Sequence, residues 1–409
     1  MQLHDIIQLD QQYYMNTFGS RFPVCFERGE GCTLFDTQGK AYTDFLAGIA
    51  VNALGYNHPA FVQALCDQIK KLLHCSNYFY IEAQAKLAQK LVENSPLDKV
   101  FFANSGAEAN EGAIKLARKY FYEKGQQKHE IIAMQQSFHG RTMATLCATG
   151  QPKYHEPYQP GVPGFVHVPF GDLPALEAAI NGQTAAVLLE VIQGEGGVLP
   201  ATESYLRGVR TLCDKQGLLL IIDEIQTGMG RTGSLFGFQH YNITPDIITL
   251  AKALGNGIPI GAFLATSDVA AAFSPGDHGT TFGGNPLACT ASLAVLHELL
   301  DNRLIQQCAK TGAFFLAQLQ GLHTKHPLSI AQVRGRGLML GVELKSPLQA
   351  KKIAAACLEH GFVIGTAGNN TLRFVPPLII QENDISRLVE FLDSLLSSEQ
   401  ESISCADRS

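Results

Sequence analysis

Hydrophobic and polar positions divide the chain into stretches of different periodicity. Residues 1 to about 55 are typical of short strands and turns, and Cys32–Asp36 predicts a strand that ends in a turn at Gly39. A helical pattern begins at Pro59, and a second one stops near Ser95-Pro96. Apolar side chains recur at helical spacing in both, at Phe61, Val62, Leu65, Ile69 and Leu72, and then at Leu87, Ala88 and Leu91.

From about residue 98 onward, short apolar runs alternate with helical stretches. The run Leu218–Ile222 is apolar at every position, which is typical of a strand buried on both faces of a mostly parallel sheet. The alternation predicts an α/β fold in which residues 56–305 form a large domain with a mostly parallel central sheet flanked by helices. The strand-like runs are Val100–Phe102, Ile131–Met134, Val187–Leu189, Leu218–Ile222 and Ile247–Leu250.

Past about residue 305 the pattern changes to that of a smaller α+β domain, over residues 306–397. We expect the N-terminal segment, residues 1–55, to contribute to this small domain. Its last helix carries an apolar face, and residues 398–409 form a polar tail that we expect to be frayed. The apolar face comprises Ile385, Leu388, Val389, Leu392 and Leu396.

Composition narrows the function classes. The 409 residues carry a net charge of −6 with 46% hydrophobic residues, which indicates a globular protein and argues against nucleic acid as the main partner. None of the ten cysteines forms a C-x-x-C pair, and the histidines show no metal-ligand spacing, so we expect reduced thiols and no metal. The chain shows neither a signal-peptide pattern nor an apolar run of about 20 residues. We therefore expect a cytoplasmic protein that does not enter a membrane.

One glycine-rich motif fails its structural test. The run Gly228–Gly233 matches G-x-G-x-x-G, but a dinucleotide-binding fingerprint must follow its strand closely and begin a helix. Five residues, Asp223–Thr227, separate this run from the preceding strand, and the residues after it have no helical pattern. A nicotinamide-dependent dehydrogenase therefore remains only a minor alternative.

Three features with chemical potential follow strands of the predicted sheet. Asp223 ends the strand Leu218–Ile222, and Lys252 follows the strand Ile247–Leu250. The run from Asn104 to Asn110 lies between the strand Val100–Phe102 and a helical pattern, so its Ser105 hydroxyl and free N–H groups could bind an anion. Because the carboxyl ends of parallel strands meet at one sheet edge, we expect the three features to lie together.

Each feature also has an ordinary structural interpretation. Asp223 could cap a strand or form a structural ion pair, Lys252 could be a solvated surface residue, and Ser105 could simply cap a helix. Together they supply an amine nucleophile, a carboxylate and a phosphate site. Pyridoxal phosphate requires this set: a lysine for covalent attachment, an acid for the pyridine nitrogen and a helix N-terminus for the phosphate.

Six sequence blocks, in family order and spacing, resemble the class III pyridoxal-phosphate aminotransferases over nearly the whole chain. The resemblance implies a fold-type I transferase. Within the family, Leu46–Val51 and His278–Ala288 are most similar to the branch that transfers the terminal amine of N-acetylornithine to 2-oxoglutarate, in arginine biosynthesis. The six blocks are Ser105–Asn110, Phe138–Thr142, Gly194–Gly197, Asp223–Gly233, Pro245–Gly255 and Thr280–Pro286.

The resemblance implies a role for each cofactor-binding residue. Lys252 would hold the cofactor covalently and shuttle a proton, and Asp223 would keep the pyridine nitrogen protonated. Gln226 would hydrogen-bond the ring hydroxyl, and Phe138 would stack on the ring. The phosphate would be held by Ser105, Gly106 and Ala107, and by Thr281 of the other subunit, which implies a homodimer. Core packing is the alternative interpretation of Phe138.

Substrate recognition is implied for three charged residues. Arg141 would bind a substrate carboxylate, and Arg373 would be the second carboxylate binder. Glu195 would neutralise Arg373 while the monocarboxylate amino donor is bound and would swing away for 2-oxoglutarate. A fixed structural salt bridge between Glu195 and Arg373 is the alternative.

Several alternatives stay open at this point. Succinylornithine, ornithine, 4-aminobutyrate or N-succinyl-diaminopimelate could be the amino donor, because Arg141 fits any donor whose carboxylate is remote from the reacting amine. An aminomutase fits the arginine pair less well. A catalytically silent relative that serves as a binding protein is the alternative from another class. The stretch Phe18–Arg21 departs from the family pattern by an extra residue, which leaves donor preference open.

Overall fold

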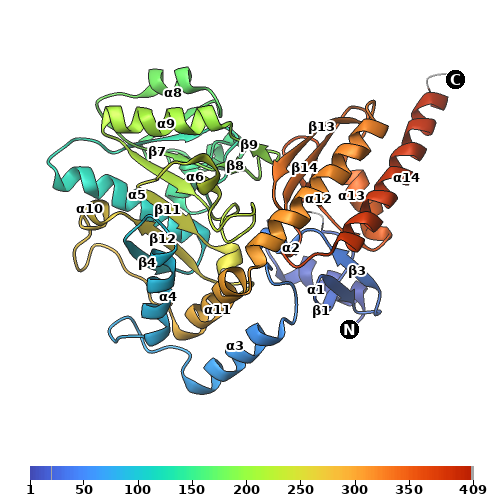
Figure 1. The fold of residues 1–409 in the computed structure, drawn as a ribbon, viewed down its shortest axis with the longest axis horizontal. Helices are drawn as coiled ribbons and strands as arrows, with labels where there is room; N and C mark the ends of the chain where they lie inside the picture. Colours follow the sequence, from blue (N-terminus) through green and yellow to red (C-terminus); the bar gives the residue numbers. More distant parts are fainter. Residues whose placement is uncertain (20, 407–409) are drawn as a thin grey trace.

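The computed structural model describes the backbone of residues 1–19 and 21–406. Figure 1 shows a larger part built around a central sheet and a smaller part that contains both ends of the described chain. Within the described residues, no helix is long and apolar enough to cross a membrane. Residue 20, the serine of the Phe18–Arg21 departure, lies outside the described residues.

The central sheet has seven strands in the order β4-β12-β11-β10-β7-β5-β6. All neighbouring strands pair in parallel except those next to β12, which runs antiparallel to both β11 and β4. The predicted α/β fold with a mostly parallel sheet is confirmed. The strands are β4 (Lys99–Ala103), β5 (Glu130–Met134), β6 (Phe165–Val168), β7 (Thr184–Leu189), β10 (Leu219–Asp223), β11 (Ile247–Leu250) and β12 (Gly261–Ala265).

Five of these strands are visible in the sequence as apolar runs, and two are not. Every residue of β7, β10 and β11 is buried, so these strands appear as continuous apolar runs. Strand β6 includes His167 and is only partly buried. Strand β12 is fully buried but begins at Gly261, where a Cβ would lie 2.2 Å from the Ser105 carbonyl oxygen, and its glycine made it resemble the preceding loop.

Helices cover both faces of the sheet (Figure 1). Helix α5 (Gly106–Glu123) packs along β12 and β11, while α9 (Glu203–Gln216) packs on β10 and against α8 (Leu173–Ala179). Helix α11 (Pro286–Leu296) packs on α3 (Pro59–Lys71) and α4 (Glu82–Glu93), and these last two confirm the predicted N-terminal helices. Shorter elements are α2 (Ala47–Ala50), α6 (Met143–Ala148), α7 (Pro152–His155), α10 (Ser267–Ala270), β8 (Ile192–Gln193) and β9 (Leu199–Pro200).

The smaller part joins segments from both ends of the chain. Strands β1 (Phe26–Glu30), β2 (Thr33–Asp36) and β3 (Ala41–Asp44) form a sheet with β15 (Phe362–Val363), which pairs parallel with β3. A second sheet has the order β13-β14-β17-β16, and helices α12, α13 and α14 complete the unit. Their bounds are β13 (Ile330–Arg336), β14 (Met339–Leu344), β16 (Gly365–Ala367), β17 (Thr371–Phe374), α12 (Leu304–Lys325), α13 (Ala350–Glu359) and α14 (Glu382–Ala406).

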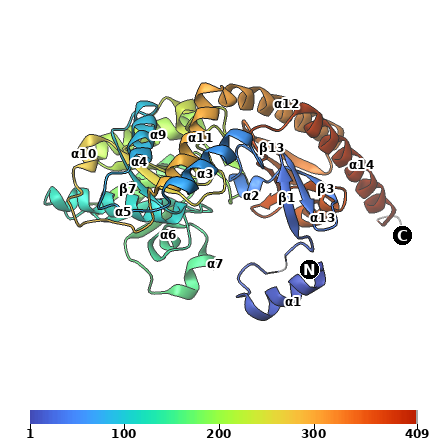
Figure 2. The ribbon, with the colours of Figure 1, turned by 90° about the horizontal axis from the view of Figure 1, so that it is seen from below.

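Two predictions about the chain ends are wrong. Residues Leu3–Tyr13 form helix α1 rather than strands and turns, and this helix buries none of its side chains, so no core-facing pattern marked it. Figure 2 shows α1 standing apart from the rest of the chain. The polar tail was expected to be frayed from residue 398, but α14 continues as a helix to Ala406. The predicted domain boundaries stay predictions.

The glycine-rich run Gly228–Gly233 forms a packed junction between the larger and smaller parts. The Arg231 side chain is fully buried, and its Nη1 donates hydrogen bonds to the carbonyl oxygens of Leu338 (3.1 Å) and Pro376. In return, the Leu338 N–H donates to the Arg231 carbonyl oxygen at 3.0 Å. Burial lowers the pKa of Arg231 to about 10. These bonds cross from the loop after β10 to the segments flanking β14 and β17.

Removing the Arg231 side chain should therefore destabilise the fold. The change Arg231→Ala deletes two hydrogen bonds and leaves a cavity, so we expect the free energy of unfolding to fall by about 3 kcal/mol. Urea unfolding followed by circular dichroism measures this. The matched control is Arg387→Ala, an exposed arginine 3.8 Å from Asp384, which should cost less than about 0.5 kcal/mol. Equal effects of the two changes would contradict the assigned role of Arg231.

Candidate active site

A cavity of about 310 Å³ lies at the carboxyl edge of the central sheet. It is lined by residues that follow β4, β5, β7, β10 and β11, because these parallel strands all end at this edge. Eight of the eleven predicted site residues line it: Ser105, Gly106, Ala107, Phe138, Glu195, Asp223, Gln226 and Lys252. Of the other three, Arg373 contacts a lining residue, Arg141 lies beside Phe138, and Thr281 lies elsewhere.

The N-terminus of α5 points its free backbone donors at this cavity. Ser105 is the N-cap and its Oγ accepts a hydrogen bond from the Glu108 N–H at 3.1 Å, while the Glu108 carboxylate accepts one from the Asn104 N–H at 2.6 Å. The first N–H groups of a helix have no partner within it, so those of Gly106 and Ala107 are suited to an anion. A Cβ at Gly106 would lie 2.8 Å from Ile225 Cδ1, so a larger residue here would require the Ile225 side chain to move.

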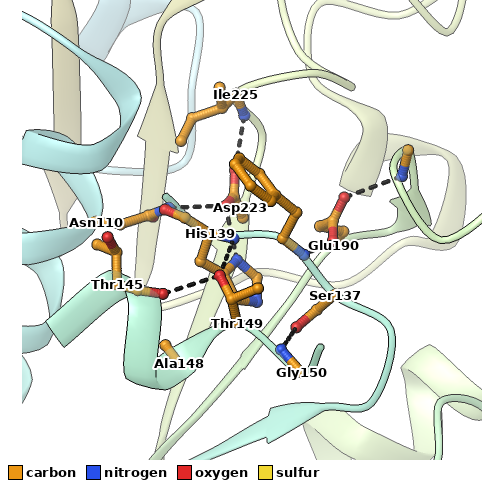
Figure 3. Close-up of polar contacts among 12 residues, drawn as sticks. Asn110, Ser137, His139, Thr145, Ala148, Thr149, Gly150, Glu190, Asp223 and Ile225 are labelled. Carbon is orange, nitrogen blue, oxygen red and sulfur yellow. Dashed lines mark hydrogen bonds and ion pairs between the residues drawn. The ribbon is translucent and has the colours of Figure 1, made fainter. Parts of the chain in front are cut away.

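Asp223 is buried and held by three neighbours (Figure 3). Its Oδ2 accepts a hydrogen bond from Asn110 Nδ2 and contacts His139 Nδ1, both at 2.8 Å. Its Oδ1 accepts the Ile225 N–H at 3.0 Å. Asn110 Nδ2 also donates to the His139 carbonyl oxygen, so the same side chain fixes both partners. Asp223 is therefore a rigid carboxylate at the floor of the cavity.

Three polar residues around Asp223 were given no role in the sequence analysis. They are Asn110, His139 and Glu190, and the last two line the cavity. Glu190 directly follows β7, so the signal that singled out Asp223 after β10 could have found it. Its carboxylate accepts the N–H groups of Phe138 (3.1 Å) and Gly194 (3.0 Å), and burial raises the pKa of Glu190 to about 7.

Lys252 lies just past the end of β11, opposite the N-terminus of α5. Its backbone φ of 45° falls in the left-handed region, which is unusual for a residue with a side chain and fixes its direction. Desolvation lowers the pKa of Lys252 to about 8, while Glu195 raises it and Arg373 lowers it. A lysine with this pKa has a substantial fraction of neutral amine near neutral pH, so it can act as a nucleophile.

Gln226 and Phe138 also line the cavity. The Oε1 atom of Gln226 is buried and, among the described residues, has no hydrogen-bond partner. Phe138 is held by its backbone bond to Glu190 and packs edge-on against Tyr154, with ring centroids 6.3 Å apart. The Gln226 side chain thus carries one unpaired acceptor at the cavity wall, and Phe138 supplies an aromatic ring there.

The two predicted carboxylate binders differ in environment. Arg373, on β17, is buried and forms an ion pair with Glu195. Burial alone would raise the pKa of Glu195, but Arg373 outweighs it and lowers this pKa. Arg141 is exposed, and its Cζ lies 3.9 Å from the Tyr154 ring centroid. Arg373 is therefore neutralised in this state and Arg141 is not.

Thr281 is the one predicted residue that this chain does not bring to the site. It is exposed and lines a different cavity, of about 610 Å³, together with Tyr78 and Thr280. Large apolar side chains near this loop are also exposed, including Tyr78, Phe79, Tyr80 and Phe282. The apolar residues predicted on one face of α3 behave similarly, because only Phe61 is buried while Val62 and Ile69 are exposed.

Comparison with known proteins finds aminotransferases both by sequence and by structure. An acetylornithine aminotransferase of Caldanaerobacter subterraneus subsp. tengcongensis is 50% identical over 96% of this chain and 99% of its own length. The solved acetylornithine aminotransferase of Elizabethkingia anophelis has a TM-score of 0.87 at 36% identity, covering 97% of this chain and 99% of its own.

A second solved relative contains the cofactor pyridoxal phosphate. It is an ornithine aminotransferase of Toxoplasma gondii with pyridoxal phosphate at partial occupancy in its active site. Its TM-score is 0.92 at 33% identity, covering 97% of this chain and 96% of its own. The family model "Aminotransferase class-III" matches residues 14–396. The predicted resemblance is thus confirmed, and the chain belongs to the class III aminotransferases, which depend on pyridoxal phosphate.

Proposed function

We propose that this protein transfers the terminal amine of N-acetylornithine to 2-oxoglutarate, giving N-acetylglutamate 5-semialdehyde and glutamate. The observation that carries the proposal is the convergence of Lys252, Asp223 and the N-terminus of α5 on one cavity. The 50% identity to an acetylornithine aminotransferase supports the choice of donor. The same reaction serves arginine biosynthesis or catabolism, depending on the direction in which it runs.

The lining residues fit pyridoxal phosphate. The free N–H groups at Gly106 and Ala107 suit its phosphate, and the Ser105 hydroxyl lies at the same helix end. The unpartnered Gln226 Oε1 suits the ring hydroxyl, Asp223 suits the pyridine nitrogen, and Phe138 offers an aromatic face. When bound, the cofactor acts as an electron sink for the bonds of the carbon that bears the amine.

Lys252 and Asp223 have complementary tasks in this proposal. Lys252 would hold the cofactor covalently, and its amine would accept and return a proton at the substrate carbon that bears the reacting amine. Its lowered pKa suits a group that must both accept and return that proton near neutral pH. Asp223, fixed by Asn110 and Ile225, would lie against the ring nitrogen and favour its protonated form.

Charge pairing explains how one cavity can take two substrates. We propose that Arg141 binds the donor's carboxylate, since among the described residues it has no carboxylate partner of its own. Glu195 neutralises Arg373 while that donor is bound. The dicarboxylate 2-oxoglutarate then engages both arginines, with Glu195 displaced from Arg373.

A homodimer would complete the site. Thr281 is exposed and outside the cavity of its own chain, which supports its contribution to the partner's phosphate site. The exposed apolar side chains near this loop, among them Tyr78, Phe79 and Tyr80, would be covered by the second subunit. We also propose a cytoplasmic location, since all described cysteines are free thiols, as is typical of reducing compartments.

The donor can be tested in a half-reaction without keto acid. The protein is loaded with pyridoxal phosphate and mixed separately with N-acetylornithine, N-succinylornithine, ornithine and 4-aminobutyrate while the cofactor absorbance is followed. We expect N-acetylornithine to react at least about tenfold faster than ornithine, whose second ammonium would lie near Arg141. A protein that reacts only with another donor would keep its family but lose the proposed substrate.

Glu195→Gln tests the charge exchange at Arg373. Without the carboxylate, Arg373 stays charged beside the monocarboxylate donor, so kcat/KM for N-acetylornithine should fall about tenfold. The KM for 2-oxoglutarate should fall at the same time, because Glu195 no longer competes for Arg373. Steady-state kinetics with each substrate varied separates these effects.

The control for this change is Glu82→Gln, which alters an exposed glutamate paired with Lys86 outside the cavity. It should leave both constants within about twofold. A Glu195→Gln enzyme in which both substrates weaken together would favour a fixed structural salt bridge instead.

The pKa of Lys252 predicts a pH dependence for cofactor capture. Only the neutral amine attacks the aldehyde, so below a pKa of about 8 the capture rate should fall about tenfold per pH unit. Above that pH the rate should level off. The measurement mixes cofactor-free protein with pyridoxal phosphate at a series of pH values, with Lys252→Ala as the inactive control. A rate that rises steadily to pH 10 would indicate an ordinary lysine.

A further inference from the structure

The Tyr154 ring lies against the guanidinium that we assign to the donor carboxylate. Arg141 Cζ lies 3.9 Å from the Tyr154 ring centroid and 5.6 Å from that of Phe138. No hydrogen bond or ion pair involves the Arg141 side chain among the described residues. The two aromatic rings therefore contact the guanidinium, and all its N–H donors stay available. A guanidinium over an aromatic face is attracted to the ring without losing its donors.

Tyr154 lies beside Arg141 because hydrogen bonds join the start of its segment to Ser137, next to the cavity residue Phe138. Helix α7 follows Gly150 and Gln151, and both bind Ser137, the residue before Phe138. The Gly150 N–H donates to Ser137 Oγ at 3.0 Å, and Gln151 Nε2 donates to the Ser137 carbonyl oxygen at 3.1 Å (Figure 3 shows the first). The Gln136 N–H also donates to the Gly150 carbonyl oxygen at 2.7 Å. The chain from Ser137 to Gly150 is thereby closed into a loop that carries Arg141.

Helix α7 also contacts strand β6. The His155 ring stacks on His167 of β6, with centroids 5.8 Å apart and planes 5° from parallel. Figure 2 shows the α7 segment projecting from the body of the larger part, so these contacts anchor an otherwise exposed segment. Lys153 places its Nζ 4.7 Å from the Tyr154 ring as well. Two cations thus share one aromatic ring, a setting that favours an anion beside them.

We propose that Tyr154 is a positioning residue that selects donors bearing a carboxylate remote from the reacting amine. It acts through Arg141. The Tyr154 ring holds the guanidinium beside Phe138, so that its free N–H groups are already in place for the carboxylate of the amino substrate. The ring face carries this role and the hydroxyl does not. This inference rests on the proposed function, since it takes Arg141 as the carboxylate binder.

The experiment compares three proteins in the half-reaction with N-acetylornithine, with donor concentration varied. For Tyr154→Leu we expect the half-saturating donor concentration to rise about fivefold, as expected for loss of a cation–π contact, with the limiting rate within about twofold. Tyr154→Phe, which keeps the ring, should match the wild type within about twofold in both quantities. Should Tyr154→Leu fail to take up cofactor, Tyr154→Gln makes the same comparison.

A double-mutant cycle with Arg141→Ala shows whether the effect of Tyr154→Leu depends on Arg141. If Tyr154 acts through Arg141, adding Tyr154→Leu to Arg141→Ala should change nothing further. A linear alkylamine without a carboxylate should likewise react equally well with the wild type and with Tyr154→Leu. An undiminished effect in the Arg141→Ala background, or a loss confined to the limiting rate, would overturn the inference, as would no effect of Tyr154→Leu.

Failure of the proposed function gives a different result. In that case the wild type itself does not react with N-acetylornithine, and the same cycle is run with the donor that it does accept. If the wild type accepts N-acetylornithine and Tyr154→Leu has the same half-saturating donor concentration, only the role of Tyr154 is overturned.

Discussion

A carboxylate at the end of a fully buried strand must be surrounded by hydrogen-bond donors, and the site is organised around meeting that need at Asp223. Its donors come from α5, from the loop after β5 and from its own turn, through Asn110, His139 and Ile225. Each segment that supplies a donor also carries a cavity residue: α5 begins at the anion site, the loop after β5 carries Phe138, and the turn after β10 carries Gln226. Satisfying one buried charge therefore places most of the site.

The smaller part of the molecule completes the site by holding the loop that bears Glu195. The Gly368 N–H donates to the Glu195 carbonyl oxygen at 2.9 Å, and Arg334 Nε donates to the carbonyl oxygens of Gly197 and Val198, both at 3.0 Å. Arg373 binds the Glu195 side chain from β17. The backbone of this loop is thus fixed while one ion pair remains that substrate charge could exchange. Arg231 also joins the two parts through its hydrogen bonds to Leu338 and Pro376.

Site residues could be predicted from the sequence where their place relative to a strand determines where they lie in the fold. Asp223, Lys252 and Ser105 could be predicted because each follows a strand of a parallel sheet, and such strand ends meet. Strand β12 and helix α1 could not, since a glycine at the start of β12 mimics a loop and α1 has no buried residues. Tyr154 could not be found either. Its contact with Arg141 depends on a loop closed by Ser137, and no local pattern encodes that closure.

The central claim is that Lys252, in this cavity, is the residue that binds the cofactor covalently. The most direct test is to load the protein with pyridoxal phosphate, reduce the linkage with borohydride and identify the modified peptide by mass spectrometry. The account predicts one stoichiometric modification, at Lys252, which is lost in Lys252→Ala. A modification at another lysine, or none in a protein that still transfers amines, would contradict it.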